Sequence, residues 1–164
     1  MNVDVRNVTC YPMIIRRASL GDWRRLAEIH VLARYDMTYL PHVHSFTSVE
    51  KWHREMVLPR QRVWVAEAEG AVVGYASLHD GLLTNLYIHP SYQGQGIGAQ
   101  LLTEVKKSTP GGFELWVFQA NHAAIRFYER HGAITVRVTD GSQNEERLPD
   151  RLMSFGGVSC DMRN

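Results

Sequence analysis

Residues 93–99 combine two glutamines, three glycines and a helix start in a pattern that can hold phosphate. The stretch reads Gln-Gly-Gln-Gly-Ile-Gly-Ala and follows an apolar run that ends at Ile88. Gly94, Gly96 and Gly98 let the backbone approach an anion without Cβ atoms in the way. The helix that begins here directs its unpaired N–H groups and the positive end of its dipole at the same place. The pattern therefore predicts a phosphate-binding turn.

A second helix start follows about twenty residues further along the chain. Asn121 opens it, and Phe127-Tyr128-Glu129 follows one to two turns later. Asparagine is a favoured N-cap residue, so Asn121 has a purely structural explanation as well as a functional one. Tyr128 can likewise be an ordinary tyrosine at the edge of the core that packs beside Phe127.

The two segments together resemble the GNAT superfamily, the acyl-CoA-dependent N-acyltransferases. That family carries Gln/Arg-x-x-Gly-x-Gly/Ala in its first segment, and Gln93, Gly96 and Gly98 occupy all three defined positions. Its second helix commonly starts with asparagine and carries a Phe-Tyr-Glu or similar run. The resemblance extends in element order from about Met13 to about Phe155.

The resemblance implies a binding cleft for acetyl-CoA. The pyrophosphate of the cosubstrate would lie on backbone N–H groups of the glycine turn, and the pantetheine arm would lie along the preceding strand, where a backbone amide could polarise the thioester carbonyl. The cofactor-binding residues implied in this way are Leu86, Tyr87, Ile88, Gln93, Gly94, Gln95, Gly96, Ile97, Gly98, Ala99, Asn121 and Tyr128.

The resemblance also assigns a general acid, but it leaves the general base open. Tyr128 matches the family's usual acid, because a phenol can protonate a thiolate as it leaves. Many family members place Glu or Asp on the strand just before the pantetheine position, where this chain has Thr84 and Asn85. Neither side chain can act as a base. His79 is the candidate by its ordinary pKa, although a lone histidine is more often structural, and Asp80 or Glu67 acting through water are weaker alternatives.

The segment between residues 35 and 46 is the expected wall of an acceptor pocket. Tyr35, Tyr39 and His42 are the candidate substrate-binding residues, with packing at a helix end as the alternative. His42 and His44, with His30 and His53 nearby, invite a metal site, but their spacing matches no standard set of ligands. We therefore expect no metal.

A dinucleotide-binding turn is the competing interpretation of the glycines. Gly94-x-Gly96-x-x-Ala99 satisfies the G-x-G-x-x-G/A fingerprint. That fingerprint belongs to a tight turn directly after its strand, with an acidic residue ending the next strand. Here Pro90-Ser-Tyr-Gln separates the strand from the glycines, and Glu114 stands at the start of the following strand. The context disfavours this interpretation.

Length and composition favour one domain that acts on a small molecule or a peptide end. The chain has 164 residues, 45% of them hydrophobic, and a net charge of +1. This balance marks neither a nucleic-acid surface nor a polybasic membrane anchor. No apolar run approaches a membrane span and no signal peptide is visible, so the expected location is cytoplasmic. Cys10 and Cys160 are expected to be reduced thiols.

Periodicity and turn residues predict an α+β fold with a mixed, mainly antiparallel sheet flanked by helices. Thr47 and Glu50 form a capping box that predicts the start of the second helix. Trp23, Trp52, Trp64 and Trp116 lie on periodic faces and are expected in the core. The predicted strands cover about 13–16, 62–69, 71–79, 82–88, 113–118, 133–139 and 152–155, and the predicted helices about 20–35, 48–57, 96–107 and 121–131.

These observations predict a leader at 1–12, a single GNAT-type domain at 13–156 and a tail at 157–164. The expected reaction moves an acetyl group from acetyl-CoA to a primary amine of a small molecule or peptide, by direct attack in a ternary complex. A non-catalytic acyl-CoA-binding or regulatory module of the same fold is the alternative, because the strand carboxylate is missing. Family members often dimerise through their C-terminal strands, so a homodimer is a further expectation.

Overall fold

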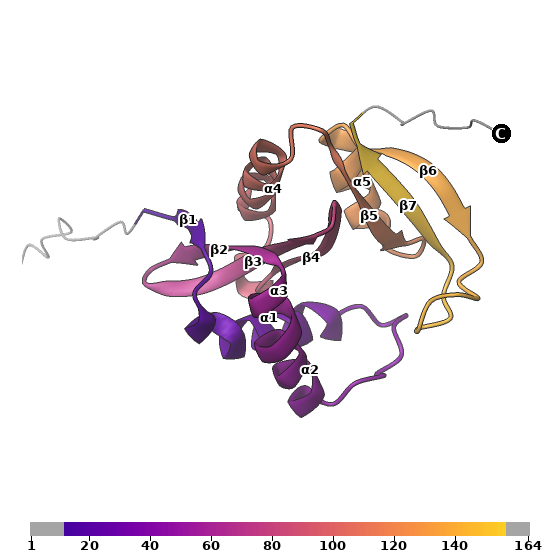
Figure 1. Cartoon of the computed structure of the whole chain (residues 1–164). Coiled ribbons are helices and arrows are strands. Elements are labelled where there is room, and N and C mark those ends of the chain that lie inside the picture. Colours follow the sequence, from indigo (N-terminus) through magenta and orange to yellow (C-terminus); the bar gives the residue numbers. More distant parts are fainter. Residues whose placement is uncertain (1–11, 157–164) are drawn as a thin grey trace, which may run out of the picture.

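The computed structural model describes residues 12–156, which form one seven-stranded sheet with helices on both faces (Figure 1). The predicted leader, except Pro12, the predicted tail and both cysteines lie outside the described residues. The strands are β1 (Ile14–Arg17), β2 (Arg62–Ala68), β3 (Ala71–His79), β4 (Leu82–Ile88), β5 (Phe113–Phe118), β6 (Ile134–Thr139) and β7 (Asp150–Phe155). The helices are α1 (Trp23–Tyr35), α2 (Phe46–Trp52), α3 (Leu58–Arg60), α4 (Ile97–Ser108) and α5 (His122–Arg130), with 3₁₀ turns η1 (Leu20–Asp22) and η3 (Pro90–Tyr92) and a π-helical turn η2 (His53–Val57).

The sheet has the order β1-β2-β3-β4-β5-β7-β6 and is mixed, as the sequence predicts. Strands β1 to β4 are antiparallel neighbours, and the tight turns at Glu69-Gly70 and Asp80-Gly81 place both residues of each pair at positive φ. The two-residue turns match the twist of the strands that they join. Strand β5 returns parallel to β4 after the crossover helix α4, and β7 and β6 then continue antiparallel.

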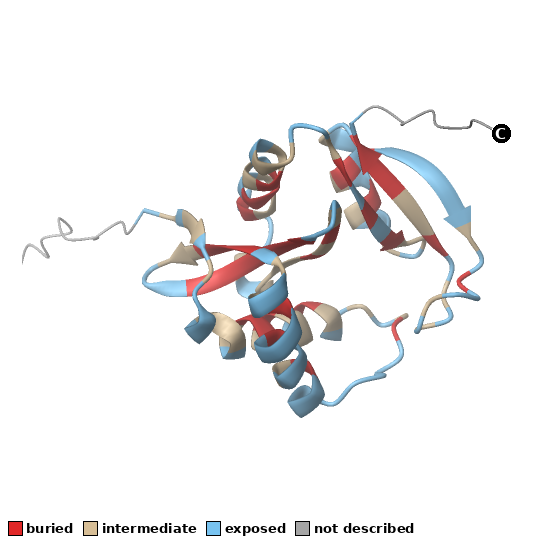
Figure 2. Ribbon diagram, viewed as in Figure 1, coloured by how far each residue is buried: buried red, intermediate tan, exposed pale blue. Residues whose placement is uncertain are grey.

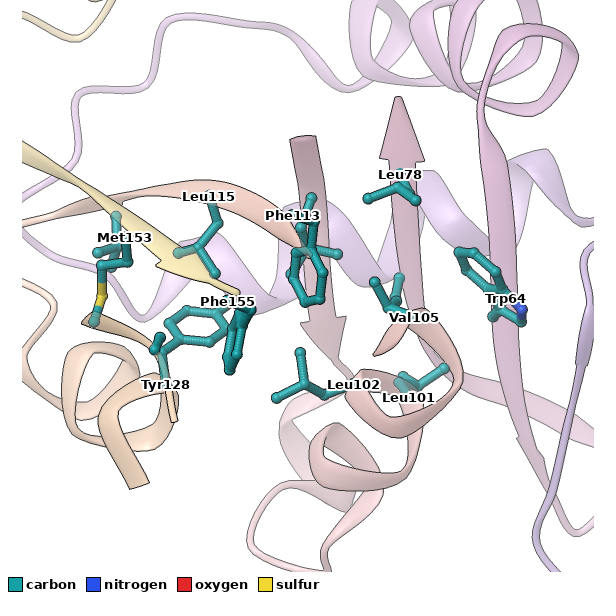
Figure 3. Close-up of a cluster of buried hydrophobic side chains, with 14 of the residues drawn as sticks. Trp64, Leu78, Leu101, Leu102, Val105, Phe113, Leu115, Tyr128, Met153 and Phe155 are labelled. Atoms are coloured by element: carbon teal, nitrogen blue, oxygen red, sulfur yellow. The ribbon is translucent and has the colours of Figure 1, made fainter. Parts of the chain in front are cut away.

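Two hydrophobic clusters cover the two faces of the sheet. The larger cluster packs α4 and α5 on one face, with Leu101, Leu115 and Met153 among its most deeply buried members (Figure 3). The smaller cluster packs α1 and the helical segment 46–60 on the other face, around Leu26, Ile29 and Tyr75. Figure 2 shows buried positions on the inner sides of the helices and on the central strands, whereas β6 at the sheet edge is mostly exposed. The middle of the sheet, where β4 lies, is therefore packed against helices on both faces.

Strands β4 and β5 diverge almost immediately after they meet. Their ladder contains one register pair, Leu82 opposite Glu114, beside a bond from the Glu114 amide to the Gly81 carbonyl. On its other side β4 keeps its antiparallel ladder with β3 as far as Ile88. Figure 1 shows β4 and β5 separating from this point. The β5-facing edge of β4 therefore has backbone groups without a ladder partner.

The start of the second helix differs from the prediction. Ser45, not Thr47, is the N-cap, and its hydroxyl accepts a hydrogen bond from the Ser48 amide. Helix α2 thus begins at Phe46, two residues before the predicted start, and continues through η2 into α3. The Ser/Thr-x-x-Glu pattern was misleading because the Ser45 hydroxyl makes the equivalent capping bond two residues earlier.

Only one of the four tryptophans belongs to the buried core. Trp64 is 6% exposed, whereas Trp116 and Trp52 are 40% and 36% exposed and Trp23 is half-buried. Arg137 lies over the Trp116 ring, and Arg24 and Arg54 lie over Trp23. A cation–π contact with an arginine can stabilise a tryptophan that stays partly exposed. The periodic spacing of the tryptophans was therefore not enough to predict which of them are buried. Within the described part of the chain, no helix has the length and apolarity needed to cross a membrane.

Candidate active site

The glycine turn joins the end of β4 to α4, and its glycines serve different purposes. Gly94 and Gly96 have φ of 76° and 79°, a backbone conformation that favours glycine. A Cβ atom added to either would meet nothing within 4 Å, so the turn is open to the outside. Gly98 has no such φ. A Cβ atom there would lie 3.5 Å from the Phe127 ring, so Gly98 brings α4 close to α5.

Gln93 links this turn to the end of β4. Its Nε2 donates to the carbonyl of Ile88, the last residue of β4, over 3.1 Å. Gly96 is the N-cap of α4, so the amides of Ile97, Gly98 and Ala99 belong to the first turn of a twelve-residue helix. Such amides have no intrahelical partner and point out of the helix start. The turn has the features of an anion-binding site.

The predicted pantetheine residues alternate between the two faces of β4. Leu86 and Ile88 pack against the larger cluster, and Tyr87 packs against the smaller one. Because this strand leaves its ladder with β5 after Leu82, its backbone can pair with an extended ligand. The predicted segment, the free strand edge and the glycine turn are thus continuous along the chain.

Helix α5 carries the other two predicted cofactor residues. The Asn121 side chain accepts from the Ala124 amide over 3.1 Å, so it caps the helix, and its amide nitrogen is left to donate elsewhere. Tyr128 is 9% exposed, and its ring lies beside Phe155 in the larger cluster (Figure 3). Burial raises the pKa of the Tyr128 phenol well above its ordinary value. The phenol therefore stays protonated at neutral pH, as a proton donor must be.

A pocket of about 550 Å³ lies on the opposite face of β4 from α4. Thr84, Asn85 and Tyr87 of β4 form part of its lining, so the pocket adjoins the predicted cofactor strand. The rest of the lining comes from α1, α2, the segment between them and the loop between β6 and β7. From these elements the lining includes His30, Val31, Arg34, Tyr35, Leu40, Pro41, His42, Val43, His44, Ser48, Val49, Trp52, Glu145 and Glu146.

Ion pairs at this pocket connect its two sides. Arg34 of α1 donates to Glu146 of the β6–β7 loop over 2.8 Å and lies 3.3 Å from the Tyr87 hydroxyl. His44 lies 3.0 Å from Glu145. The two ion pairs join residues more than one hundred positions apart in sequence. Through Arg34 the loop is tied to α1, and α1 is tied to β4.

Neutral polar groups occupy the position where the family usually has a carboxylate. The Thr84 hydroxyl donates to Gln61 Oε1 over 2.6 Å and lies 2.7 Å from the Ser77 hydroxyl. The Asn85 amide donates to the same Ser77 hydroxyl over 2.7 Å. These groups satisfy one another, and none can accept a proton from an amine at neutral pH. This part of β4 supplies no base.

Two histidines and two tyrosines form a compact group, of which His30 and Tyr87 line the pocket. The His30 ring lies edge-on to Tyr87, Trp52 and His53, with ring centres 4.9, 5.8 and 5.3 Å away. His53 and Tyr75 are fully buried. Burial lowers the pKa of His30 to about 3, with smaller contributions from nearby positive charge, and lowers that of His53 to about 4. Both rings are neutral at physiological pH.

The structure brings some predicted residues together and separates others. Tyr35 and His42 line the pocket, with ring centres 6.3 Å apart. Tyr39 lines a different, smaller pocket with Gln119 and His122, and its buried hydroxyl has no hydrogen-bond partner among residues 12–156. His79 lies at the turn between β3 and β4, with its side chain 48% exposed and 3.4 Å from Asp80. It does not line the 550 Å³ pocket.

Sequence reasoning missed His30, Arg34 and Glu146 as pocket residues. His30 did carry a signal, because it is a polar residue in the apolar series of α1 between Leu26 and Ala33. Glu146 had none, since it lies in a polar loop whose return to α1 depends on the whole sheet. The described residues contain no group of three or more His, Cys, Asp or Glu side chains that could hold a metal ion.

Comparison with protein families gives a consistent match. Residues 59–132 match a family model described as an acetyltransferase (GNAT) domain. The peptidyl-lysine N-acetyltransferase YiaC of Escherichia coli (strain K12) is 30% identical over 120 residues, which cover 68% of this chain and 80% of YiaC. The uncharacterized N-acetyltransferase Rv2669 of Mycobacterium tuberculosis is 33% identical over 104 residues, covering 56% of this chain and 67% of Rv2669.

Solved structures share the fold at lower identity. YncA from Salmonella typhimurium, determined with its cofactor acetyl-CoA, has a TM-score of 0.71 at 22% identity and covers 93% of this chain and 99% of its own. PaiA from Thermoplasma acidophilum, in complex with coenzyme A, has a TM-score of 0.67 at 23% identity and covers 89% and 99%. At identities below 25%, these TM-scores show a likeness of fold alone.

Proposed function

This chain belongs to the GNAT family of acyl-CoA-dependent N-acetyltransferases, and we propose that it acetylates a primary amine of a small molecule or peptide by direct attack in a ternary complex. The proposal assigns this activity to residues 13–156, with acetyl-CoA as cosubstrate and without a metal. It includes a cytoplasmic location and a homodimer. The enzyme interpretation takes precedence over a non-catalytic module because the matched relatives are named N-acetyltransferases.

One observation carries the proposal: two binding regions meet at β4. The free edge of this strand and the glycine turn suit an extended cosubstrate with a pyrophosphate, and Thr84, Asn85 and Tyr87 of the same strand line the 550 Å³ pocket. A thioester at the strand and an amine in the pocket would then be neighbours. Holding both reactants together replaces a bimolecular encounter and can lower the barrier substantially.

Each side of the reaction has candidate groups in this chain. The amides at the start of α4 would hold the pyrophosphate, and a β4 amide would polarise the thioester carbonyl. The protonated Tyr128 would donate its proton to the departing thiolate. Tyr35 and His42 would contact the acceptor, and Glu145 and Glu146 give the pocket a carboxylate-bearing side that suits a cationic amine.

A lysine side chain in a peptide is the first acceptor to test. The relative YiaC is named a peptidyl-lysine N-acetyltransferase, whereas a shorter match to MnaT of the same organism is to a protein named an L-amino acid N-acyltransferase. We therefore favour a peptide lysine and regard a free amino acid as the second choice.

Calorimetric titration with acetyl-CoA, beside NADH, tests the cosubstrate. We expect acetyl-CoA to bind saturably and NADH not to bind. If NADH binds and acetyl-CoA does not, the proposal is overturned in favour of a dinucleotide site. Release of free thiol from acetyl-CoA is then measured with a lysine peptide, an N-terminal peptide amine and free amino acids. Acetyl-CoA binding without acetylation of any amine would favour the non-catalytic module.

A further inference from the structure

A continuous chain of hydrogen bonds connects the backbone of α2 to the wall of the acceptor pocket. His53 Nδ1 lies 2.9 Å from the Val49 carbonyl, and His53 Nε2 lies 2.9 Å from the Tyr75 hydroxyl. The same hydroxyl lies 3.3 Å from His30 Nδ1. His30 of α1, Tyr75 of β3 and His53 of η2 thus form one line of hydrogen bonds. Tyr75 and His53 are fully buried.

The donors and acceptors in this chain can be assigned from chemistry alone. A carbonyl only accepts, so His53 Nδ1 carries the hydrogen and, in the neutral ring, His53 Nε2 carries the lone pair. The Tyr75 hydroxyl must then donate its single hydrogen to His53. Its oxygen remains free to accept, so His30 Nδ1 donates to Tyr75. Neutral His30 is therefore held with its lone pair on Nε2.

His30 Nε2 is open to the acceptor pocket. This atom has no hydrogen-bond partner within residues 12–156, and it is not among the fully buried polar atoms that lack one. His30 lines the pocket together with Thr84, Asn85 and Tyr87 of β4. The accessible lone pair therefore lies in the same cavity as the cofactor strand.

The surroundings of His30 keep this lone pair free of protons. His53 faces it from η2, Tyr75 and Tyr87 face it from the sheet, and Arg34 and His44 are the nearby groups that add positive charge when protonated. Burial and these cations together favour the neutral ring, which also makes it a weak base. It can therefore accept a proton only once N–C bond formation has made the amine nitrogen cationic and acidic. Among the other lining groups, Thr84 and Asn85 are neutral, and the carboxylates of Glu145 and Glu146 already face His44 and Arg34.

We propose that His30 Nε2 is the catalytic proton acceptor for the attacking amine, and that Tyr75 and His53 are positioning residues that fix its tautomer. This inference rests on the proposed function and adds the general base that the sequence left open. His79, the base expected from the sequence, lies outside the pocket and is replaced in this role.

The proton and electron balance of the step is complete. The neutral amine nitrogen uses its lone pair to form the N–C bond to the thioester carbonyl carbon, and the C–S bond breaks with its electron pair leaving on sulfur. The acylated nitrogen loses one proton to His30 Nε2, and the thiolate gains one from Tyr128. Return of the proton from His30 to the Tyr128 oxygen through water restores both groups, so an amide and a free thiol are the only products.

Nuclear magnetic resonance of ¹⁵N-histidine-labelled protein tests the tautomers without an acceptor. We expect His30 and His53 both to carry hydrogen on Nδ1 and to remain neutral from pH 8 to pH 5. Tyr75→Phe should shift His30 toward the Nε2–H form that free imidazole side chains favour. Hydrogen on Nε2 of His30 in the unmodified protein would overturn the inference.

Thiol release with the best acceptor of the panel tests the chemical role. His30→Gln should lower kcat about 100-fold, the scale of a general base, with little change in the amine KM. Tyr75→Phe should give a smaller loss, whereas His122→Gln, which removes an exposed histidine at the start of α5, serves as the control and should keep the rate. Added imidazole should restore part of the activity of His30→Ala, and a purely structural role would not permit that rescue.

The outcomes separate this inference from the proposed function. Unchanged kcat in His30→Gln, or a loss in His79→Gln in its place, overturns the role of His30 even if the protein is an active acetyltransferase. Failure of the unmodified protein to bind acetyl-CoA counts against the proposed function. Acetyl-CoA titration of each variant shows whether a loss of rate arises from the chemistry or from a damaged fold.

Discussion

The two sides of β4 are built on different principles. The proposed cofactor side consists of a strand edge, a glycine turn and a helix start that follow one another within residues 82–99, and it presents mainly backbone groups. The proposed acceptor side consists of side chains from α1, α2, β4 and the β6–β7 loop, which meet only in the folded chain. A site made from contiguous backbone depends on few residue types, whereas a site made from distant side chains can change by substitution at any of them. The first side suits a constant cosubstrate and the second a variable acceptor.

Substitution in the glycine turn should produce the largest effect and should fall on the cofactor side alone. Gly96→Val places a branched side chain at φ of 79° and over the amides at the start of α4, so acetyl-CoA affinity should fall by at least about 100-fold. Calorimetry measures the loss. Gly111→Ala is the matched control, because that glycine has no positive φ and an added Cβ meets nothing within 4 Å. Normal affinity in Gly96→Val would remove the phosphate-binding assignment.

Loss of the Tyr128 hydroxyl should separate chemistry from binding on the same side. Tyr128→Phe should lower kcat by about 100-fold, as expected for a general acid, and should leave the dissociation constant of acetyl-CoA nearly unchanged. The ring remains to pack beside Phe155, so the fold should be kept. Thiol-release kinetics and calorimetry on one preparation provide both numbers. An unaltered kcat would exclude Tyr128 as the acid.

Acid should destabilise the acceptor side before it affects the cofactor turn. The pKa values of His30 and His53 are about 3 and 4 in the folded protein and near 6.5 when unfolded, so the unfolded chain takes up protons first as the pH falls. Stability should therefore be complete above pH 6.5 and should decrease between pH 6.5 and pH 5 by about 2 kcal/mol for each ring. Urea unfolding at several pH values measures the slope, and His53→Gln should reduce it. A flat profile would mean that these rings are not held neutral.

Breaking the pair between Arg34 and Glu146 should weaken the acceptor and spare the cosubstrate. Glu146→Gln removes the charge that holds the β6–β7 loop against α1, so the amine KM should rise about tenfold while acetyl-CoA affinity stays constant. Glu104→Gln on α4, which removes one partner of an exposed pair with Lys107, is the control and should change neither quantity. A parallel loss of acetyl-CoA affinity would show that the two sides are not independent.

Substitution at the N-cap of α2 should have the smallest effect, and that effect should be on stability. Ser45→Ala removes the hydroxyl that accepts from the Ser48 amide at the start of α2 and should cost about 1 kcal/mol of unfolding free energy. Thr47→Ala, at the residue that the sequence pattern favoured, should cost less. Thermal unfolding compares the two variants. The reverse order would restore the predicted capping box.

The same contrast explains what could be predicted from the sequence. The order of helices and strands, the mixed sheet and the glycine turn all follow from local patterns, because turn residues and periodicity act over short distances. His79 is the candidate base from the sequence by its ordinary pKa, but its side chain lies outside the pocket. His30 and Glu146 belong to the site through packing of α1 and of a loop after β6. These contacts depend on tertiary structure, which no local pattern encodes.

The single register pair between β4 and β5 also has a mechanical consequence. Strands β1–β4 and strands β5–β7 form two panels of one sheet, and their hydrogen-bonded seam is one residue pair long. An extended ligand that pairs with the β4 edge would lengthen this seam, so occupancy would lock the panels together as well as supply the acetyl group. Free energy of binding would then add to the stability of both panels through mass action. In this way the cosubstrate would act as a removable structural element of the sheet.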